Sequence, residues 1–418
     1  MLNFLIGALK VIVLLGTLIF IHEFGHFVVA KIFKIKVHKF SIGFGPKIFY
    51  KKGKETEYSI RAIPLGGFVQ LEGEDTESDD ERSFSKKPIW QRILVLLAGV
   101  FVNITFAIIV YLSIYMNVNY YVVPKIAKDS NVESLKQYGL EVGDTIYSVD
   151  GKRIYNDYDL DNIILGSSKN EFLFTIIKED NSKEFKNVKF EEQEVGYAGL
   201  AFNPDGTIAY VLKDSAGEKA GFQANDKVVS ANGIANENND NVIDIIKSNG
   251  NKEINIVALR GNEEKNFTLK PELVRKKLID LNFEVVRDTD FFNNMSLAWN
   301  ETKSYLRANV EGIIGLIRGD NKNVEVTGIV GISSEITKTQ NALEFLYLMS
   351  AISLSLGIMN LLPIPGLDGG KILICLIEAV RGKPMSKKVE GAITLISFSL
   401  LMIFMIYVTI GDISKLFS

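Results

Sequence analysis

Four long segments of this chain carry little charge, and they alternate with segments rich in polar and charged residues. The apolar segments cover residues 2–30, 93–115, 343–362 and 392–410. Each is close to or above the roughly 20 residues that a helix needs to cross a lipid bilayer. The first segment lacks the small-residue cleavage site of a signal peptide, so we expect it to be retained. The pattern predicts a polytopic α-helical membrane protein with about four transmembrane helices.

Basic residues gather in the two short segments that join the first helix to the second and the third to the fourth, 31–92 and 371–391. Because short basic loops stay in the cytoplasm, this distribution predicts that both segments are cytoplasmic. The termini and the long segment 117–342 are then extracytoplasmic. The long segment is dense in Lys, Asp, Glu and Asn, as a water-exposed insert would be.

The insert contains an internal repeat. Three pairs of residues lie 82 positions apart: Gly139 and Gly221, Asp144 and Asp226, and Gly151 and Gly233. One spacing shared by three pairs indicates two copies of one folding unit. Both copies resemble PDZ domains, whose Leu-x-x-Gly-Asp-x-Ile turn occupies residues 140–146 of the first copy.

The second copy departs from the PDZ turn at Asn225, which stands where glycine is expected. Asparagine adopts a left-handed backbone more readily than most residues, so we expect the turn to be retained. PDZ domains bind extended peptides by adding them to a sheet edge. The sequence equally allows the two copies to act as spacers or size filters without a peptide ligand.

After the repeats, residues 291–317 carry apolar side chains at helical spacing and predict one or two amphipathic helices. Such a helix could lie on the outer membrane surface and control access to the membrane-spanning part. Packing of the same face against the repeats is the alternative.

The clearest chemistry lies near the end of the first apolar segment, where His22, Glu23 and His26 form a His-Glu-x-x-His pattern. Residues four apart share one face of a helix, so both imidazoles can bind one metal ion, and Glu23 can deprotonate a water molecule. Ionisable groups inside a membrane are costly unless partnered, which favours this function over a structural histidine pair. A catalytic zinc usually has three protein ligands, so one more must come from elsewhere.

Asp368 is the candidate for the third ligand. It follows residues 360–367, where prolines and glycine interrupt the helix, and broken backbone at membrane depth is tolerated only where it lines a cavity or the protein interior. The expected topology places Asp368 and the two histidines at the cytoplasmic ends of their helices. The third histidine of the chain, His38, has Lys36 and Lys39 as neighbours and is interpreted as a surface residue.

These motifs resemble those of the site-2 protease family of intramembrane metalloproteases, and in particular the bacterial enzymes of regulated intramembrane proteolysis of the RseP/RasP type. That family pairs an HExxH helix with an N-x-x-P-x-P-x-L-D-G segment, which residues 360–369 match. It also carries extracytoplasmic PDZ domains between its second and third helices. The resemblance extends over essentially the whole chain.

The resemblance implies roles for individual residues. The zinc ligands would be His22, His26 and Asp368, and Glu23 would be the general base. Asn360 would help to hold the substrate backbone.

Two further segments are similar to features of the family. Residues 63–69, which include Gly66 and Gly67, are similar to its membrane-re-entrant β-loop, which presents a strand edge to the substrate. A plain surface hairpin would show the same pattern. Residues 98–103 are similar to its A-G-P-x-x-N segment, with Val100 in place of the proline, which removes the basis for a local kink.

The chain is therefore expected to begin with a first transmembrane helix that carries the HExxH motif (1–33), a cytoplasmic or re-entrant region with a β-hairpin (34–90) and a second transmembrane helix (91–116). An extracytoplasmic α+β insert of two PDZ-like domains (117–192 and 193–272) and an amphipathic helical connector (273–342) are expected to follow. The last parts are a third transmembrane helix with the N-x-x-P-x-P-x-L-D-G segment (343–370), a cytoplasmic loop (371–391) and a fourth transmembrane helix (392–411).

The function implied by the resemblance is that of a zinc metalloendopeptidase of the bacterial cytoplasmic membrane, which hydrolyses peptide bonds in the transmembrane segments of single-pass membrane proteins. Substrates of such enzymes include anti-sigma factors already trimmed outside, signal-peptide remnants and pheromone precursors. The net charge of -3 gives no indication of a nucleic-acid partner, and the single cysteine, Cys375, is interpreted as a small apolar helix residue.

Two other functions compete with proteolysis. The chain could be a non-catalytic membrane PDZ adaptor with a vestigial metal site, but such a site has no reason to keep Glu23. A metal transporter would need further polar residues along the transmembrane helices, and the apolar segments contain few.

Overall fold

The structure is a computed structural model that divides into two compact units, Met1–Tyr121 with Val286–Ser418 (unit 1) and Val122–Val285 (unit 2). It describes residues 2–74, 76, 78–118, 121–128, 130–155, 157–202, 206–212, 214–236, 239–261, 263–277, 279, 281–286, 290–319, 327–339, 341–383 and 385–417.

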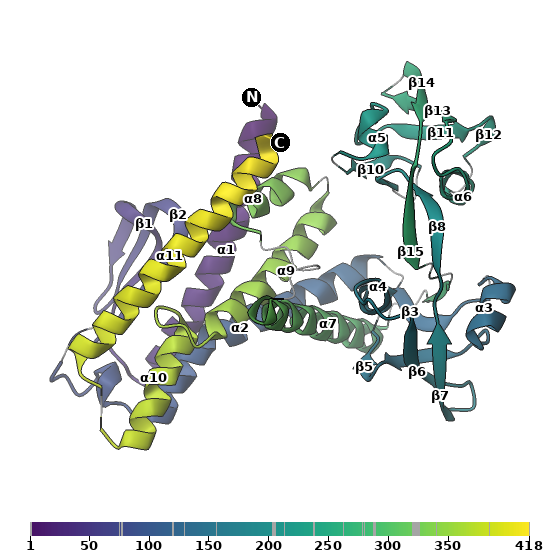
Figure 1. Cartoon of the computed structure of the whole chain (residues 1–418). Coiled ribbons are helices and arrows are strands. Elements are labelled where there is room, and N and C mark those ends of the chain that lie inside the picture. The colour runs from purple at the N-terminus through teal and green to yellow at the C-terminus, as the bar shows by residue number, and fades with distance from the viewer. Residues whose placement is uncertain are drawn as a thin grey trace. The chain divides into compact units, whose positions relative to one another are not determined.

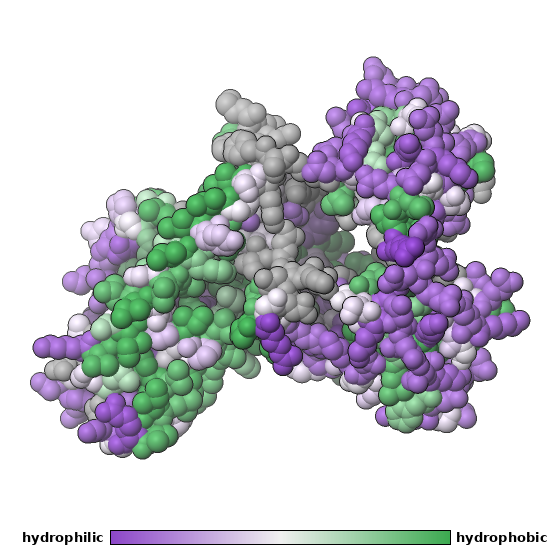
Figure 2. Space-filling view, in the orientation of Figure 1, coloured by the Kyte–Doolittle hydropathy of each residue, from purple (hydrophilic) through white to green (hydrophobic). Residues whose placement is uncertain are grey.

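Unit 1 is mainly helical (Figure 1). Its helices are α1 (Leu2–Ile32), α2 (Ile89–Val118), α7 (Phe291–Arg318), α8 (Ile329–Lys338), α9 (Ala342–Leu361), α10 (Asp368–Arg381) and α11 (Lys387–Phe417), with a short 3-10 helix η1 (Phe84–Lys86) before α2. Within the described residues, four helices are long and apolar enough to cross a membrane: α1, α2, α9 and α11. These are the four that the apolar segments predict. Hydrophobic residues cover the visible face of α11 in Figure 2, whereas hydrophilic residues dominate the visible surface of unit 2.

Two expected boundaries differ from the structure. The segment 273–342, expected to be a helical connector, begins with two strands, β15 (Glu272–Lys277) and β16 (Phe283–Val286). They pair with β8 (Glu192–Tyr197) and β3 (Tyr121–Ile126), far away in the sequence, so local pattern alone does not identify them. The expected loop 371–391 instead continues α10 to Arg381, because residues 368–381 contain apolar positions at helical spacing and the helix ends at Gly382 in the left-handed conformation.

The strands of unit 1 are β1 (Val37–Lys52) and β2 (Glu57–Leu71). They form the expected hairpin, and both strands bend so that the hairpin folds back on itself. Phe40 lies opposite both Tyr58 and Val69, and Tyr50 lies opposite Ser59. The hairpin is therefore a sheet of four antiparallel segments in the order 47–52, 57–61, 37–42 and 67–71. Residues 67–71 form one of its two edges.

Within its described residues, unit 2 contains two sheets of four or more strands, each with its own hydrophobic core, and two further pairs of strands. Its strands are β3 (Tyr121–Ile126), β4 (Thr145–Val149), β5 (Lys152–Arg153), β6 (Glu171–Ile177), β7 (Lys183–Lys189), β8 (Glu192–Tyr197), β9 (Leu200–Phe202), β10 (Ile208–Val211), β11 (Lys227–Ala231), β12 (Ile234–Ala235), β13 (Ile254–Arg260), β14 (Glu263–Leu269), β15 and β16; its helices are α3 (Val132–Tyr138), α4 (Asp157–Leu165), α5 (Ala216–Lys219) and α6 (Asp240–Ser248).

The first sheet has the order β16-β3-β4-β6-β7, with β5 pairing β4, and the second has the order β12-β11-β13-β14. Phe172 and Phe174 are buried in the first core, and Ile254 and Ile256 in the second.

The 82-residue repeat has a matching structure in both copies. Asp144 and Asp226 are both buried, and they form ion pairs of 2.9 Å with Lys178 and 2.7 Å with Arg260. These two cations are themselves 82 positions apart. The turn before each aspartate is left-handed, with φ 90° at Gly143 and φ 70° at Asn225. Asparagine thus takes over the backbone role of glycine in the second copy.

Candidate metal centre

The two histidines of the HExxH motif lie on one face of α1, next to α2. Both His22 and His26 are 8% exposed. Their Nε2 atoms are 3.2 Å apart, and their rings meet edge to face with centroids separated by 4.8 Å. The helix repeat accounts for this arrangement, because residues four apart lie one above the other.

Asp368 reaches the histidines because the chain turns sharply between α9 and α10. Residues 362–367 form a compact turn that is held by hydrogen bonds such as Leu367 N to Ile364 O (3.0 Å). Gly369 and Gly370 follow this turn, and a Cβ on either would lie within 2.3 Å of a backbone oxygen. Only glycine permits such a close approach, and it places Asp368 in the first turn of α10.

The Oδ2 atom of Asp368 lies 3.2 Å from His22 Nε2 and 3.3 Å from His26 Nε2. Ligand atoms around a tetrahedral zinc with bonds of about 2.0–2.1 Å are roughly 3.3–3.4 Å apart. The three atoms therefore form a triangle of the right size for three corners of such a site. Asp368 Oδ2 is also buried and has no hydrogen-bond partner within the described part of the chain. An oxygen that binds a cation is expected to have this environment.

Helix α2 supports the cluster from behind. His26 Nδ1 lies 2.8 Å from the carbonyl oxygen of Val95, and His22 Nδ1 lies 3.2 Å from the amide nitrogen of Asn103. Between these two residues, Gly99 faces both imidazoles directly. A Cβ at Gly99 would lie 2.6 Å from His22 Cε1 and 2.6 Å from His26 Nε2. The histidines and α2 are thus in direct contact over two turns of helix.

Glu23 and the predicted substrate-binding residues lie around the same cluster. Glu23 is half-buried on α1, and a Cβ at Gly67 would lie 3.0 Å from its Cγ. Gly67 is the first residue of the edge segment 67–71, and Gly66 precedes it with φ +125° beside the ring of Phe44. The amide nitrogen of Asn360 lies 3.2 Å from His22 Nε2, at the end of α9.

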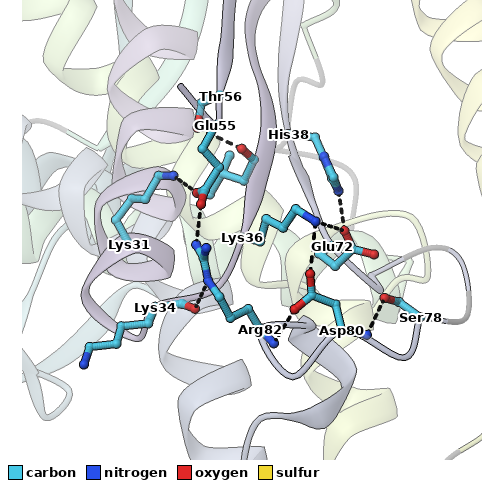
Figure 3. A network of polar contacts seen from close by, with 11 residues as sticks. Lys31, Lys34, Lys36, His38, Glu55, Thr56, Glu72, Ser78, Asp80 and Arg82 are labelled. Atoms are coloured by element: carbon cyan, nitrogen blue, oxygen red, sulfur yellow. Dashed lines mark hydrogen bonds and ion pairs between the residues drawn. The ribbon is translucent and has the colours of Figure 1, made fainter. Parts of the chain in front are cut away.

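His38 lies outside the cluster and belongs to a network of charged residues between α1, the hairpin and residues 78–82 (Figure 3). Its Nε2 atom is 2.5 Å from Glu72, and its side chain is 38% exposed, as expected for a surface histidine. In the same network, hydrogen bonding from Lys31, at the end of α1, lowers the pKa of Glu55 to about 2. Arg82 also binds Glu55, at 2.6 Å. The network ties the hairpin to the helix that carries the histidines.

Comparison with known proteins shows which family the chain belongs to. The family model for peptidase family M50 matches residues 10–404. The chain belongs to peptidase family M50. This assignment confirms the resemblance to the site-2 proteases, and it makes the M50 chain a zinc metalloendopeptidase with membrane-spanning helices.

Similar proteins cover the whole length of this M50 peptidase. It is 29% identical to the regulator of sigma-E protease RseP of Escherichia coli over 100% of both chains. It is 29% identical to protease RseP of Yersinia pestis, over 97% of this chain and 98% of the relative, and 28% identical to zinc metalloprotease RasP of Geobacillus kaustophilus, over 97% of both.

Two residues that contact the histidines have no role predicted from the sequence. Asn103 and Gly99 belong to the segment 98–103, whose similarity to a family motif was visible, but that similarity gave neither residue a task. The structure shows what the segment does, since it is the surface of α2 on which both imidazoles rest.

Proposed function

We propose that this M50 peptidase hydrolyses peptide bonds in the transmembrane segments of single-pass membrane proteins, within the bilayer or at its edge. The observation that carries the proposal is the triangle formed by His22, His26 and Asp368, two of which lie on a helix apolar enough to cross a membrane. A metal centre on a membrane-spanning helix is positioned to contact the membrane-spanning segment of its substrate.

The roles we propose follow from the geometry. His22, His26 and Asp368 hold zinc, which when bound supplies Lewis-acid activation of water and of the scissile carbonyl. Glu23, next to His22 on α1, takes the proton from the attacking water and passes it to the leaving nitrogen. Asn360, whose amide points at the cluster, donates a hydrogen bond to the substrate backbone.

The hairpin supplies a place for the substrate strand. A helical substrate satisfies its own backbone hydrogen bonds, so it must unwind before its peptide bonds can be attacked. The edge segment 67–71 is paired on one side, with 37–42, and Gly67 adjoins Glu23. We propose that an unwound substrate segment adds to this edge at Gly66 and Gly67, which provides replacement hydrogen bonds beside the general base.

Unit 2 is proposed to consist of two PDZ-like domains on the extracytoplasmic side, with the metal centre near the cytoplasmic side. The matched ion pairs of Asp144 and Asp226 support two copies of one fold. The basic segments between α1 and α2 and around α10 support the sidedness.

A Glu23→Gln variant tests the proteolytic function. In purified protein with a single-span substrate, cleavage is expected to fall by a factor on the order of 10²–10⁴, because the general base is lost, while zinc content stays at the wild-type level. Glu171→Gln, at an exposed carboxylate of unit 2, is the matched control and is expected to cleave normally. A zinc chelator is expected to stop the wild-type reaction. Undiminished cleavage by the Glu23 variant would contradict the role of Glu23 as general base, and a purified wild-type protein that cleaves nothing would instead support the adaptor function.

A further inference from the structure

Each imidazole of the cluster has one nitrogen that faces the other ligands and one that faces α2. In both His22 and His26 the inner nitrogen is Nε2, so this atom must keep a free lone pair if it is to bind zinc. A neutral imidazole carries one proton, which must then be on Nδ1. Each Nδ1–H therefore needs a hydrogen-bond acceptor on α2.

For His26 the acceptor is evident. The atom 2.8 Å from its Nδ1 is the carbonyl oxygen of Val95, which can only accept a hydrogen bond. This contact fixes the tautomer and the direction of the ring. Because it is a backbone group, no substitution at Val95 removes it.

For His22 the neighbour is the side-chain amide of Asn103, at 3.2 Å. Asn103 is fully buried, and its Oδ1 atom has no hydrogen-bond partner in the described part of the chain. The two ends of an amide group exchange by a half-turn about one bond. That half-turn places the unpartnered oxygen opposite the Nδ1–H of His22, so that the oxygen and the N–H become hydrogen-bond partners.

We propose that Asn103 is a positioning residue for the metal centre: its Oδ1 accepts the hydrogen bond of His22 Nδ1–H and thereby holds the Nε2 lone pair of His22 towards zinc. The inference rests on the metal centre proposed above. Partners of this kind orient metal-binding histidines and raise their basicity, and their loss costs about 10- to 100-fold in metal affinity.

The backbone of Asn103 is itself held in place by α9. Ser353 Oγ donates a hydrogen bond of 2.9 Å to the Asn103 carbonyl, and the Asn103 side chain packs where Gly357 leaves space, with a Cβ at Gly357 lying 3.7 Å from Asn103 Cβ. The amide of Asn103 is thus held in place where α2 packs against α9. This rigidity is what a group that orients a ligand requires.

Zinc affinity of three variants tests the inference, measured on the full-length protein in detergent by competition with a chromophoric chelator. Asn103→Leu keeps the size but removes the acceptor, and its affinity is expected to fall about 10- to 100-fold. Asn103→Asp keeps the acceptor and is expected to bind at least as tightly as wild type. Ser350→Ala is the matched control: it removes a buried hydroxyl of the same helix, α9, which donates to Leu346 O at 3.0 Å and does not hold Asn103, and its zinc affinity is expected to be unchanged.

A second measurement does not depend on whether the leucine variant folds. The chain has only three histidines, so a 15N-histidine spectrum contains three imidazoles. In the zinc-loaded protein, Asn103→Asp is expected to shift the Nδ1 resonance of His22 and to leave those of His26 and His38 in place. Wild-type affinity in Asn103→Leu, equal losses in the leucine and aspartate variants, or an unmoved His22 resonance would each overturn the role of Asn103. Wild-type protein that holds no zinc would contradict the metal centre itself.

Discussion

Gly99 is a residue of α2 that lies directly against His22 and His26, two of the proposed metal ligands. A methyl group there would overlap both imidazoles, at 2.6 Å from His22 Cε1 and from His26 Nε2. We therefore expect Gly99→Ala to displace the two rings and to reduce zinc affinity by a factor on the order of 10–100, as for other changes to groups that orient metal ligands. A zinc titration of the purified variant measures the effect.

Gly16 provides the control for this substitution. It lies in the apolar helix α1, and a Cβ there would meet nothing within 4 Å. Gly16→Ala is expected to leave zinc affinity unchanged and to stabilise the helix by about 0.5–1 kcal/mol, since alanine loses less backbone freedom. If Gly99→Ala bound zinc as tightly as Gly16→Ala, the contact between α2 and the imidazoles would not be as close as the structure shows.

At the scale of residues, sequence identified the groups whose chemistry is unusual for their place. His22, Glu23 and His26 stand out because polar groups are costly in an apolar helix, and Asp368 because it follows a broken one. Asn103 and Gly99 do not stand out, because asparagine and glycine have many uses. Their position under the imidazoles depends on how α1 crosses α2, which a single sequence does not contain.

Among the helices, α10 carries Asp368, and a buried ion pair attaches it to α2. Arg92 Nη1 lies 2.6 Å from Glu378 Oε2, and the two side chains are 10% and 7% exposed. Glu378→Ala leaves Arg92 buried without its partner, which typically costs about 3–5 kcal/mol. We expect a lower unfolding temperature in detergent and, because α10 is loosened, weaker zinc binding.

The double variant Arg92→Met/Glu378→Met separates charge from packing. Replacement of both members of a buried pair by apolar residues of similar size is often neutral, so this variant is expected to regain most of the stability lost in Glu378→Ala. Thermal unfolding of the two variants measures the difference. Equal losses in both would show that the helices are held together by packing that the methionines also disturb.

At the scale of elements, helices were easier to predict than strands. The apolar segments predicted α1, α2 and α9 to within a few residues, and they predicted the middle of α11, because helical pattern and length are local properties. The hairpin was expected, but its folding into four segments was not. That arrangement depends on Phe40 pairing with both Tyr58 and Val69, a register that involves three separate stretches of chain.

On the scale of the whole molecule, the first and last strands of the insert pair with each other. Strand β3, at its start, and β16, at its end, are neighbours in one sheet, although about 160 residues separate them. The repeat was visible in the sequence because it depends on matched local turns. The return of the chain to the first sheet was not visible, because it depends on a pairing between distant strands, and it moved the end of the insert past the expected boundary at residue 272.

The sidedness of the chain can be tested with single cysteines. The chain has one cysteine, Cys375, which is 1% exposed, so Cys375→Ser gives a background without reactive thiols. Glu171, in unit 2, and Lys383, after α10, are both exposed. In that background we expect Glu171→Cys to react with a membrane-impermeant maleimide added to intact cells, and Lys383→Cys to react only after lysis.

The physical reason for this expectation is the distribution of basic residues. Lysines and arginines near the ends of membrane helices resist translocation, and they are concentrated between α1 and α2 and around α10. Of the proposed metal ligands, His22 and His26 lie in the last third of α1 and Asp368 is the first residue of α10, next to these basic segments, so the same experiment locates the proposed centre. Labelling of Lys383→Cys in intact cells, with protection of Glu171→Cys, would place the centre at the outer surface and would require substrates to be cut from the opposite side.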